Sequence, residues 1–290
     1  MRSQIAPVVA GYDGSPVSRG ALHWAAVEAV STGLPLRIVE VFELVITTHP
    51  SPGAVVPLEG LRTARQKGLD AIIEDLRLHH PGLDVTGALL TGTPAATLIE
   101  ESEHARMLVL GTRGLGALTS LLLGSVSIQV SAHARCPVVV VRPESPAPTP
   151  EPVILVGVDG SKVSADAIDF AFAEASARHG RIVAVHAWTS PVTSPEGEPT
   201  PLLFDLDEIE KAARLLVAES LAGARADYPD VDVEIRLVMG RPDRILVEQG
   251  YTADLIVVGS RGRGGFTGLL VGSVAHAVLH HADRPVALVR

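Results

Sequence analysis

Residues 8–15 of the chain read VVAGYDGS, and residues 154–161 read ILVGVDGS. In both stretches an apolar run typical of a buried strand leads directly into Asp-Gly-Ser, a sequence typical of a tight turn. A second pair of matching stretches, residues 107–142 and 255–290, is identical at 18 of 36 positions. Because both pairs recur in the same order and at almost the same spacing, the sequence predicts two copies of one domain.

The two copies account for nearly all of the 290 residues. We expect the first domain at 1–142 and the second at 153–290, joined by a linker at 143–152. Pro occupies alternate positions of the linker, so this segment cannot form a helix and is expected to be a semi-rigid, extended spacer. Each domain is long enough to bury a core of its own.

Strand and helix patterns alternate within each copy. In the first copy we expect strands at 5–11, 36–42, 85–90, 107–110 and 137–141, and helices at 17–32, 61–80, 94–106 and 125–134. The strands are apolar throughout, which is typical of a parallel sheet with helices on both faces. The sequence therefore predicts an α/β fold made of two tandem doubly wound, Rossmann-like domains.

Composition and charge exclude several classes of protein. The formal net charge of −9 argues against a nucleic-acid partner, which normally requires a basic stripe. The single cysteine, Cys136, excludes an internal disulfide and a cysteine-cluster metal site. No apolar stretch approaches 18 residues, so we expect no membrane span, no membrane partner and a cytoplasmic location.

Two polar signals follow strands at the sheet edge where doubly wound folds bind ligands. One is the Asp of each Asp-Gly-Ser turn, Asp13 and Asp159. The other is the pattern Gly-x2-Gly-x9-Gly-Ser, which occupies residues 111–125 and recurs at 259–273. Glycines allow backbone N–H groups to approach a phosphate, and the start of a helix favours negative charge.

An aspartate in this position can accept a hydrogen bond from a sugar hydroxyl or help to hold a metal ion that bridges phosphates. Together the two signals predict a nucleotide site in each copy. The alternative remains open that the glycines and the Asp-Gly-Ser segments form only tight turns and helix caps. Other nucleotide and hydrolase motifs are missing at the required positions: the P-loop, the dinucleotide Gly-x-Gly-x-x-Gly and the nucleophile elbow.

These residues resemble the universal stress protein family, in its tandem two-domain form and its ATP-binding branch. The resemblance rests on the glycine pattern, the aspartate after the first strand and the segment HARCPV at 133–138. It implies a five-stranded sheet of order 3-2-1-4-5 in each domain, with ATP in the crevice between strands 1 and 4. It also implies that the backbone of Val41 and Ala187 contacts adenine. The family pattern has a His at the position before this contact. The second copy has it as His186, whereas Glu40 of the first copy departs from the pattern.

The motifs and the resemblance together assign nucleotide-binding residues in both copies and no metal ligands. In the first copy they are Gly11, Tyr12, Asp13, Gly14, Ser15, Val41, Gly111, Thr112, Arg113, Gly114, Gly124, Ser125, Val126 and Ser127. In the second copy they are Gly157, Val158, Asp159, Gly160, Ser161, Ala187, Gly259, Ser260, Arg261, Gly262, Gly272, Ser273 and Val274. The expected cofactor is ATP with Mg²⁺.

No motif places a His or Glu as a general base, so an efficient ATPase is not indicated and no catalytic residue is assigned. The resemblance implies a nucleotide-dependent regulator of stress adaptation or growth, with one ATP per domain and a homodimeric assembly through the tandem domains. Two alternatives remain open. One is an enzyme that slowly hydrolyses ATP or transfers its phosphate, and the other is a protein that binds another adenine nucleotide, such as a cyclic one.

Overall fold

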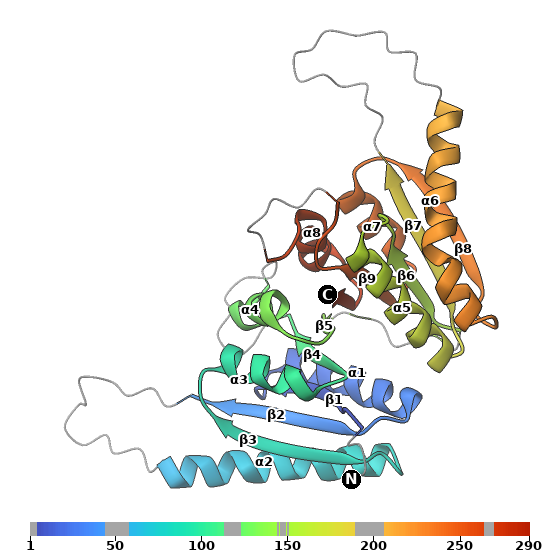
Figure 1. Cartoon of the computed structure of the whole chain (residues 1–290). Helices are drawn as coiled ribbons and strands as arrows, with labels where there is room; N and C mark the ends of the chain where they lie inside the picture. Colours follow the sequence, from blue (N-terminus) through green and yellow to red (C-terminus); the bar gives the residue numbers. More distant parts are fainter. Residues whose placement is uncertain are drawn as a thin grey trace, which may run out of the picture. The chain divides into compact units, whose positions relative to one another are not determined.

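The computed structural model describes residues 5–43, 58–112, 123–143, 145, 149, 151–188, 206–263 and 270–290. The chain divides into two compact units, Met1–Pro143 (unit 1) and Glu144–Arg290 (unit 2). Each unit alternates strands with helices along the chain (Figure 1).

Unit 1 contains a five-stranded sheet in the order β3-β2-β1-β4-β5, and every pairing between neighbouring strands is parallel. Its elements are β1 Val8–Tyr12, α1 Pro16–Thr32, β2 Leu36–Phe42, α2 Leu58–His79, β3 Val85–Thr91, α3 Pro94–Glu101, the 3₁₀ turn η1 Ser102–His104, β4 Met107–Gly111, α4 Ser125–His133 and β5 Val138–Val141.

Unit 2 repeats this order as β8-β7-β6-β9-β10, again with parallel pairings. Its elements are β6 Val153–Gly157, α5 Lys162–Ala177, β7 Arg181–Trp188, α6 Leu206–Asp227, β8 Val233–Met239, α7 Pro242–Gly250, β9 Leu255–Gly259, α8 Ser273–His281 and β10 Val286–Val289. The prediction of two tandem doubly wound α/β domains is therefore confirmed.

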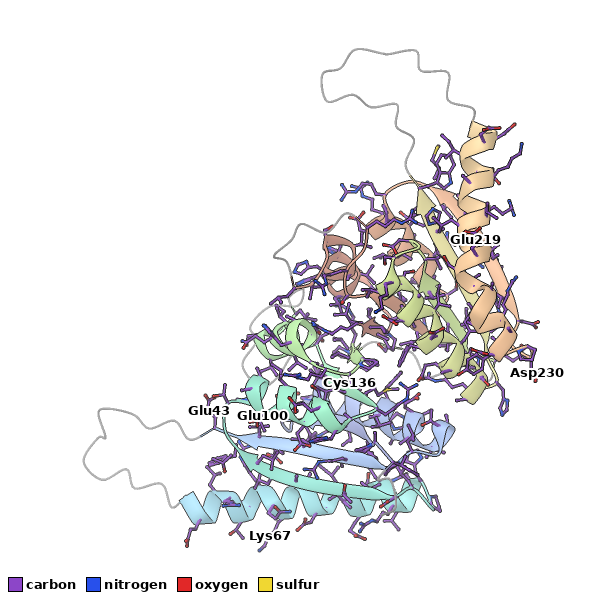
Figure 2. All side chains as sticks on the ribbon, in the orientation of Figure 1. Glu43, Lys67, Glu100, Cys136, Glu219 and Asp230 are labelled. Carbon is purple, nitrogen blue, oxygen red and sulfur yellow. The ribbon has the colours of Figure 1, made fainter. Side chains whose placement is uncertain are left out.

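Helices cover both faces of each sheet. In unit 2, a Cβ atom placed on Gly157 of β6 would face Leu246 of α7, whereas one placed on Gly259 of β9 would face Val163 of α5. Helix α6 contacts α5, and α8 contacts α7, so the four helices form two layers with the sheet between them. Exposed charged residues such as Lys67 on α2 and Glu219 on α6 belong to the outer helices (Figure 2).

The core of each unit is aliphatic. The largest fully buried side chains are Leu, Ile and Met with one aromatic exception, Phe172. Each such side chain contributes about 1.5–3 kcal/mol when it is removed from water. A buried parallel sheet filled in this way needs few rings, in line with an aromatic content of 3%.

Several element boundaries differ from the sequence-based expectation by one to five residues, and two of them have a clear physical reason. The first strand begins at Val8 rather than at residue 5, because Pro7 has no N–H to donate and only its carbonyl is paired, with Arg106 N at 2.8 Å. The helix expected at 94–106 ends at Glu101, and a 3₁₀ turn follows. There the Ser102 hydroxyl donates to Ile99 O at 2.5 Å and accepts from Arg135 N at 2.9 Å.

The C-terminal end of the linker is attached to unit 2 through Asp254. The carboxylate of this buried residue accepts hydrogen bonds from Thr149 N at 3.0 Å, from the Thr149 hydroxyl at 2.9 Å and from Val153 N at 2.8 Å. Unit 1 has Arg106 at the equivalent position. This anchor is therefore specific to the second copy.

Candidate functional site

The Asp-Gly-Ser turns have the same geometry in both units. Gly14 and Gly160 have φ values of +89° and +74°, in the left-handed region that favours glycine. The Oδ1 atom of the preceding aspartate accepts a hydrogen bond from the serine N–H, at 3.0 Å in unit 1 and 2.9 Å in unit 2. The turn directs each aspartate from the end of the first strand toward the carboxyl edge of the sheet.

The serines of these turns cap the next helix. Ser15 Oγ accepts from Ser18 N, and Ser161 Oγ accepts from Ser164 N, both at 3.1 Å. This is the ordinary geometry of a helix N-cap. One N–H group in the first turn of α1 and one in the first turn of α5 are thus already bonded to the preceding serine.

Helices α4 and α8 begin differently. Their N-cap residues are Gly124 and Gly272, and neither helix has a side-chain cap. The two glycines are held against the end of the preceding strand, because Gly124 N donates to Thr112 O at 2.6 Å and Gly272 N donates to Ser260 O at 2.7 Å. The first turns of α4 and α8 therefore present backbone N–H groups and a positive dipole end to which an anion can bind.

In unit 2 the loop after β9 lies directly against Asp159. Arg263 N donates to Asp159 Oδ2 at 3.0 Å, and a Cβ atom placed on Gly262 would lie 2.5 Å from the same oxygen. A Cβ atom on Gly272 would lie 3.8 Å from Gly262 N. The aspartate turn, the glycine loop and the start of α8 thus meet at one point.

A cavity of about 510 Å³ opens at this point. Its described lining consists of Gly157, Val158, Asp159, Ser164, Val185, Ala187, Pro242, Leu246, Val258, Gly259, Arg261, Gly262, Arg263, Gly272, Ser273, Val274 and Ala275. Aliphatic side chains of β7, β9 and α7 form one part of the wall, and the aspartate, serines, arginines and glycine loop form the other. The volume lies in the range of small-molecule sites, and the lining suits a ligand that joins an apolar ring to an anionic group.

The charge near the glycine loop is positive although the whole chain is acidic. Arg261 and Arg263 line the cavity and are exposed to solvent. Burial, together with the nearby charge of Arg261, lowers the pKa of Arg290. An anion bound beside these guanidinium groups would relieve their mutual repulsion.

The structure brings most of the residues assigned in the second copy into this cavity. Gly160, Ser161 and Ser260 are not among the described lining residues: the first two form the turn and the cap, and Ser260 is buried with its N–H bonded to Val289 O. The sequence reasoning missed Ser164, Val185, Pro242, Leu246, Val258 and Ala275. Arg263 also lines the cavity; the sequence shows it as an extra positive charge of the second copy, but it was not among the assigned binding residues. Val185 could have been found, because it alternates with Ala187 on the same face of β7.

In unit 1 the assigned Gly11, Tyr12, Asp13 and Gly14 end β1 and form its turn, and Val41 lies on β2. Gly111 ends β4, Ser125, Val126 and Ser127 lie in the first turn of α4, and the side chain of Thr112 is buried. The Ser127 hydroxyl donates to Gly111 O at 2.7 Å, which ties α4 to the strand end. Arg113 and Gly114 lie outside the described residues.

The first glycine of each glycine pattern also has a packing role. A Cβ atom on Gly111 would lie 2.8 Å from Val17 Cγ1, and one on Gly259 would lie 3.1 Å from Val163 Cγ1. At this position the close approach of strand and helix requires glycine. Packing therefore explains why glycine occurs at these two positions, although Gly259 also lines the cavity together with Gly262 and Gly272.

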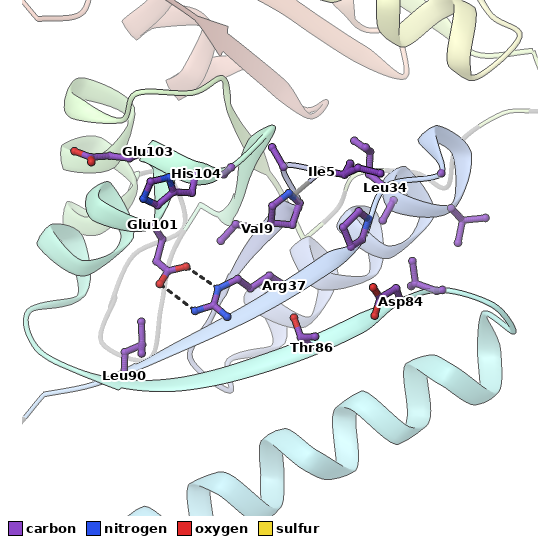
Figure 3. Close-up of a pocket in the computed structure, with 18 of the residues that line it drawn as sticks. Ile5, Val9, Leu34, Arg37, Asp84, Thr86, Leu90, Glu101, Glu103 and His104 are labelled. Carbon is purple, nitrogen blue, oxygen red and sulfur yellow. Dashed lines mark hydrogen bonds and ion pairs between the residues drawn. The ribbon is translucent and has the colours of Figure 1, made fainter. Parts of the chain in front are cut away.

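A larger groove of about 1430 Å³ lies on unit 1 at the opposite edge of the sheet (Figure 3). Arg37 crosses it and forms a two-pronged ion pair with Glu101, with Nε–Oε2 at 2.7 Å and Nη2–Oε1 at 3.1 Å. This hydrogen bonding raises the pKa of Arg37. The guanidinium is therefore already paired, and neither the aspartate turn nor the described part of the glycine loop, Gly111, Thr112 and Gly124, lines the groove. The unit 2 cavity is the better candidate site.

Within the described part of the chain, none of the helices combines the length and the apolar character that a membrane span requires. Among the same residues, no group of three or more His, Cys, Asp or Glu side chains is arranged to hold a metal ion.

The sequence of the chain matches a known protein family in both units. The model of the universal stress protein family matches residues 5–142 and again 152–290. A universal stress protein of Mycobacterium tuberculosis is 40% identical over 299 residues, which cover 98% of this chain and 96% of the relative. One from Mycolicibacterium smegmatis is 38% identical over 289 residues, with the same coverage.

The fold has solved counterparts. The crystal structure of a universal stress protein from Archaeoglobus fulgidus matches with a TM-score of 0.71 at 20% identity, and covers 99% of this chain and 98% of the other. At that identity the similarity concerns the fold alone. The family match and the sequence identities carry the assignment: the chain belongs to the universal stress protein family, in a tandem form with one family domain in each unit.

Proposed function

We propose that the protein is an adenine-nucleotide-binding regulator that takes ATP with Mg²⁺, one nucleotide per unit. The observation that carries the proposal is the unit 2 cavity, in which an aliphatic wall adjoins a glycine loop, an uncapped helix N-terminus and two arginines. The chain would then belong to the ATP-binding branch of the family. A cytoplasmic location, a homodimeric assembly and a role in stress adaptation or growth complete the proposal.

Different residues of the cavity would contact the base, the phosphates and the sugar of the nucleotide. Val185, Ala187 and Leu246 would cover the faces of the base. The backbone N–H groups of Gly262 and of the first turn of α8 would bind phosphate oxygens, with Arg261 and Arg263 beside them. The second lone pairs of the Asp159 oxygens remain available to a sugar hydroxyl, although each oxygen already accepts one backbone N–H.

The residues present also fit a phosphate-borne Mg²⁺. This ion keeps most of its waters and takes one or two carboxylates in addition to phosphate oxygens. Asp159 is the one acidic side chain among the described lining residues, so it would supply the protein ligand. Bound in this way, Mg²⁺ would neutralise phosphate charge that the two arginines alone do not balance.

A regulator fits the lining better than an efficient enzyme does. No His, Glu or Lys is found among the described lining residues, and both oxygens of the one carboxylate there, Asp159, already accept backbone N–H groups. The described lining therefore offers no carboxylate or imidazole that is held ready to take a proton from an attacking water. Arg261 and Arg263 are the observation that favours the second candidate, a slow ATPase, because guanidinium groups can stabilise charge on a transferring phosphoryl group.

Calorimetry on the full chain tests the proposal. ATP with Mg²⁺ should bind, and GTP should bind more weakly if the wall recognises adenine; ADP and cyclic AMP establish how much the phosphate chain contributes. A single-turnover assay should then show cleavage far slower than about 1 s⁻¹, the low end of ordinary enzymatic turnover. If none of the four nucleotides bound, the proposal would be contradicted. Cleavage at or above that rate would favour the second candidate, an ATP-hydrolysing enzyme.

A further inference from the structure

The two units carry almost the same set of cavity residues. At 12 of the 17 described lining positions of unit 2, the equivalent position of unit 1 holds the same amino acid. The strand registers make the equivalence certain on the sheet, since β1 pairs with β2 and β4 as β6 pairs with β7 and β9. The few positions that differ therefore decide whether the two sites are equal.

The difference in available space is clearest next to the glycine of the first strand of each unit, Gly11 on β1 and Gly157 on β6. In unit 2 a Cβ atom placed on Gly157 would lie 3.2 Å from Leu246 and 3.6 Å from Val258 Cγ1. In unit 1 a Cβ atom on Gly11 would lie 2.5 Å from Cδ2 of Leu110, the residue that replaces Val258. The longer Leu110 side chain therefore extends over the glycine into the space that borders the cavity in unit 2.

Three other exchanges act in the same direction. Val41 replaces Ala187, Tyr12 replaces Val158 and Ser127 replaces Ala275, so each adds atoms in unit 1. The fifth exchange removes a cation, because the residue of unit 1 equivalent to Arg263 is Leu115, which lies outside the described residues. Less room for the base and less positive charge for the phosphates both weaken the binding of a nucleotide.

We propose that the two sites are unequal: unit 2 holds the high-affinity adenine-nucleotide site, and Leu110 together with Val41 restricts the site of unit 1. This inference rests on the proposed function. It adds a consequence for regulation, because the chain passes through a state with only unit 2 occupied over a range of nucleotide concentration. Unit 1 responds when the concentration rises further.

Calorimetric titration of the full chain with ATP and Mg²⁺ should resolve two classes of site that differ at least about tenfold in dissociation constant, since one methylene in an apolar pocket already changes affinity about tenfold or more. The Gly262→Glu variant leaves only the weaker site. In that background Leu110→Val should tighten binding by about tenfold, and adding Val41→Ala should tighten it further.

The reciprocal change and a matched control complete the test. With Gly114→Glu in place, Val258→Leu should weaken the remaining site by about tenfold. Leu108→Val serves as the control, because Leu108 lies two residues before Leu110 on the same strand, is fully buried, and has a counterpart, Ile256, that is not among the described lining residues. Leu108→Val should leave the affinity of the unit 1 site unchanged.

The possible results separate this inference from the proposed function. Two sites of equal affinity, or a Leu110→Val variant that binds no better than its parent, would overturn the inequality while leaving nucleotide binding intact. If Leu108→Val tightened binding as much as Leu110→Val, general loosening of the core would be the cause and the assignment to Leu110 would be wrong. Failure of the wild-type chain to bind any nucleotide would overturn both proposals.

Discussion

Where helices pack on the sheet, the two units differ by pairs of exchanges in which one change offsets the other. Around the cavity they differ by single exchanges without such a partner. Beneath α2, Glu40 is buried and pairs with Arg65 at 2.6 Å; unit 2 has His186 and Ala213 at these positions, and His186 Nδ1 donates to Val158 O at 2.7 Å. Charge and size thus change together on the strand and on the helix that covers it, and the polar side chain at this strand position is paired in both units.

The opposite face shows the same compensation. In unit 1, Arg37 of β2 binds Glu101, and the equivalent residue of unit 2 is the smaller Val183. In unit 2, Arg236 of β8 donates to Gln249 at 2.8 Å, and the equivalent residue of unit 1 is the smaller Ala88. Among the described residues that line the cavity in unit 2 and their described equivalents in unit 1, by contrast, each exchange gives unit 1 the larger side chain, and no described partner compensates for it. Paired exchanges preserve the fold, whereas the unpaired ones change what the site can hold.

The largest expected effect comes from the loop that contacts Asp159. Gly262→Glu places a carboxylate where phosphates would bind, and like charges in contact cost several kcal/mol. We expect affinity at the unit 2 site to fall by about 100-fold or more. Gly262→Ala should already cost about tenfold, because its Cβ would lie 2.5 Å from Asp159 Oδ2.

Calorimetry measures both losses. Gly223→Ala is the matched control, since Gly223 lies in α6 with no described atom within 4 Å of an added Cβ. If Gly262→Glu bound ATP as tightly and with the same stoichiometry as the parent, the glycine loop would not be a phosphate site.

The paired exchange beneath α2 predicts a loss of stability that the partner change repairs. Arg65→Ala leaves the Glu40 carboxylate buried without its partner, a change that costs about 3–5 kcal/mol in a fully buried pair. Because about a third of the Arg65 side chain is exposed (33%), we expect a decrease of about 2 kcal/mol in the free energy of unfolding of unit 1. The double variant Glu40→His with Arg65→Ala, which installs the residues of unit 2, should recover most of that loss.

Tryptophan fluorescence during urea unfolding reports this change in unit 1. Of the two tryptophans, Trp24 lies in α1 and Trp188 in β7, so a Trp188→Phe background leaves Trp24 as the signal of unit 1. Equal stability of Arg65→Ala and the double variant would show that the exchange is not a compensating pair.

The smallest expected effect concerns Cys136, which has no counterpart because unit 2 carries Arg284 there. Burial raises the pKa of the Cys136 thiol to about 12. Only about one thiol in ten thousand is then ionised at pH 8, so the native protein should react with a disulfide reagent far more slowly than the unfolded chain does. Rapid labelling of the native protein at pH 8, with the guanidinium-unfolded chain as the reference, would contradict a buried packing role.

The sequence was sufficient for the fold and for the polar part of the candidate site. Apolar runs followed by Asp-Gly-Ser or Gly-x2-Gly locate the strand ends, and the duplication separates the pattern from chance. Pro242 and Leu246 could not be predicted in the same way, because the apolar face of α7 resembles any other buried helix face until the fold places it above β6 and β7. The bond between Arg263 N and Asp159 likewise joins residues about a hundred positions apart, and no local pattern indicates it.

The central claim is that unit 2 binds an adenine nucleotide at the Asp159 turn and the glycine loop. Its most direct measurement is to purify the chain without added nucleotide, denature it, and identify and count what is released by chromatography and mass spectrometry. ATP or a related adenine nucleotide should be released from the wild-type chain, and the Gly262→Glu variant should lose the nucleotide of unit 2. Release of no nucleotide from the wild-type chain, together with no uptake when ATP and Mg²⁺ are supplied, would contradict it.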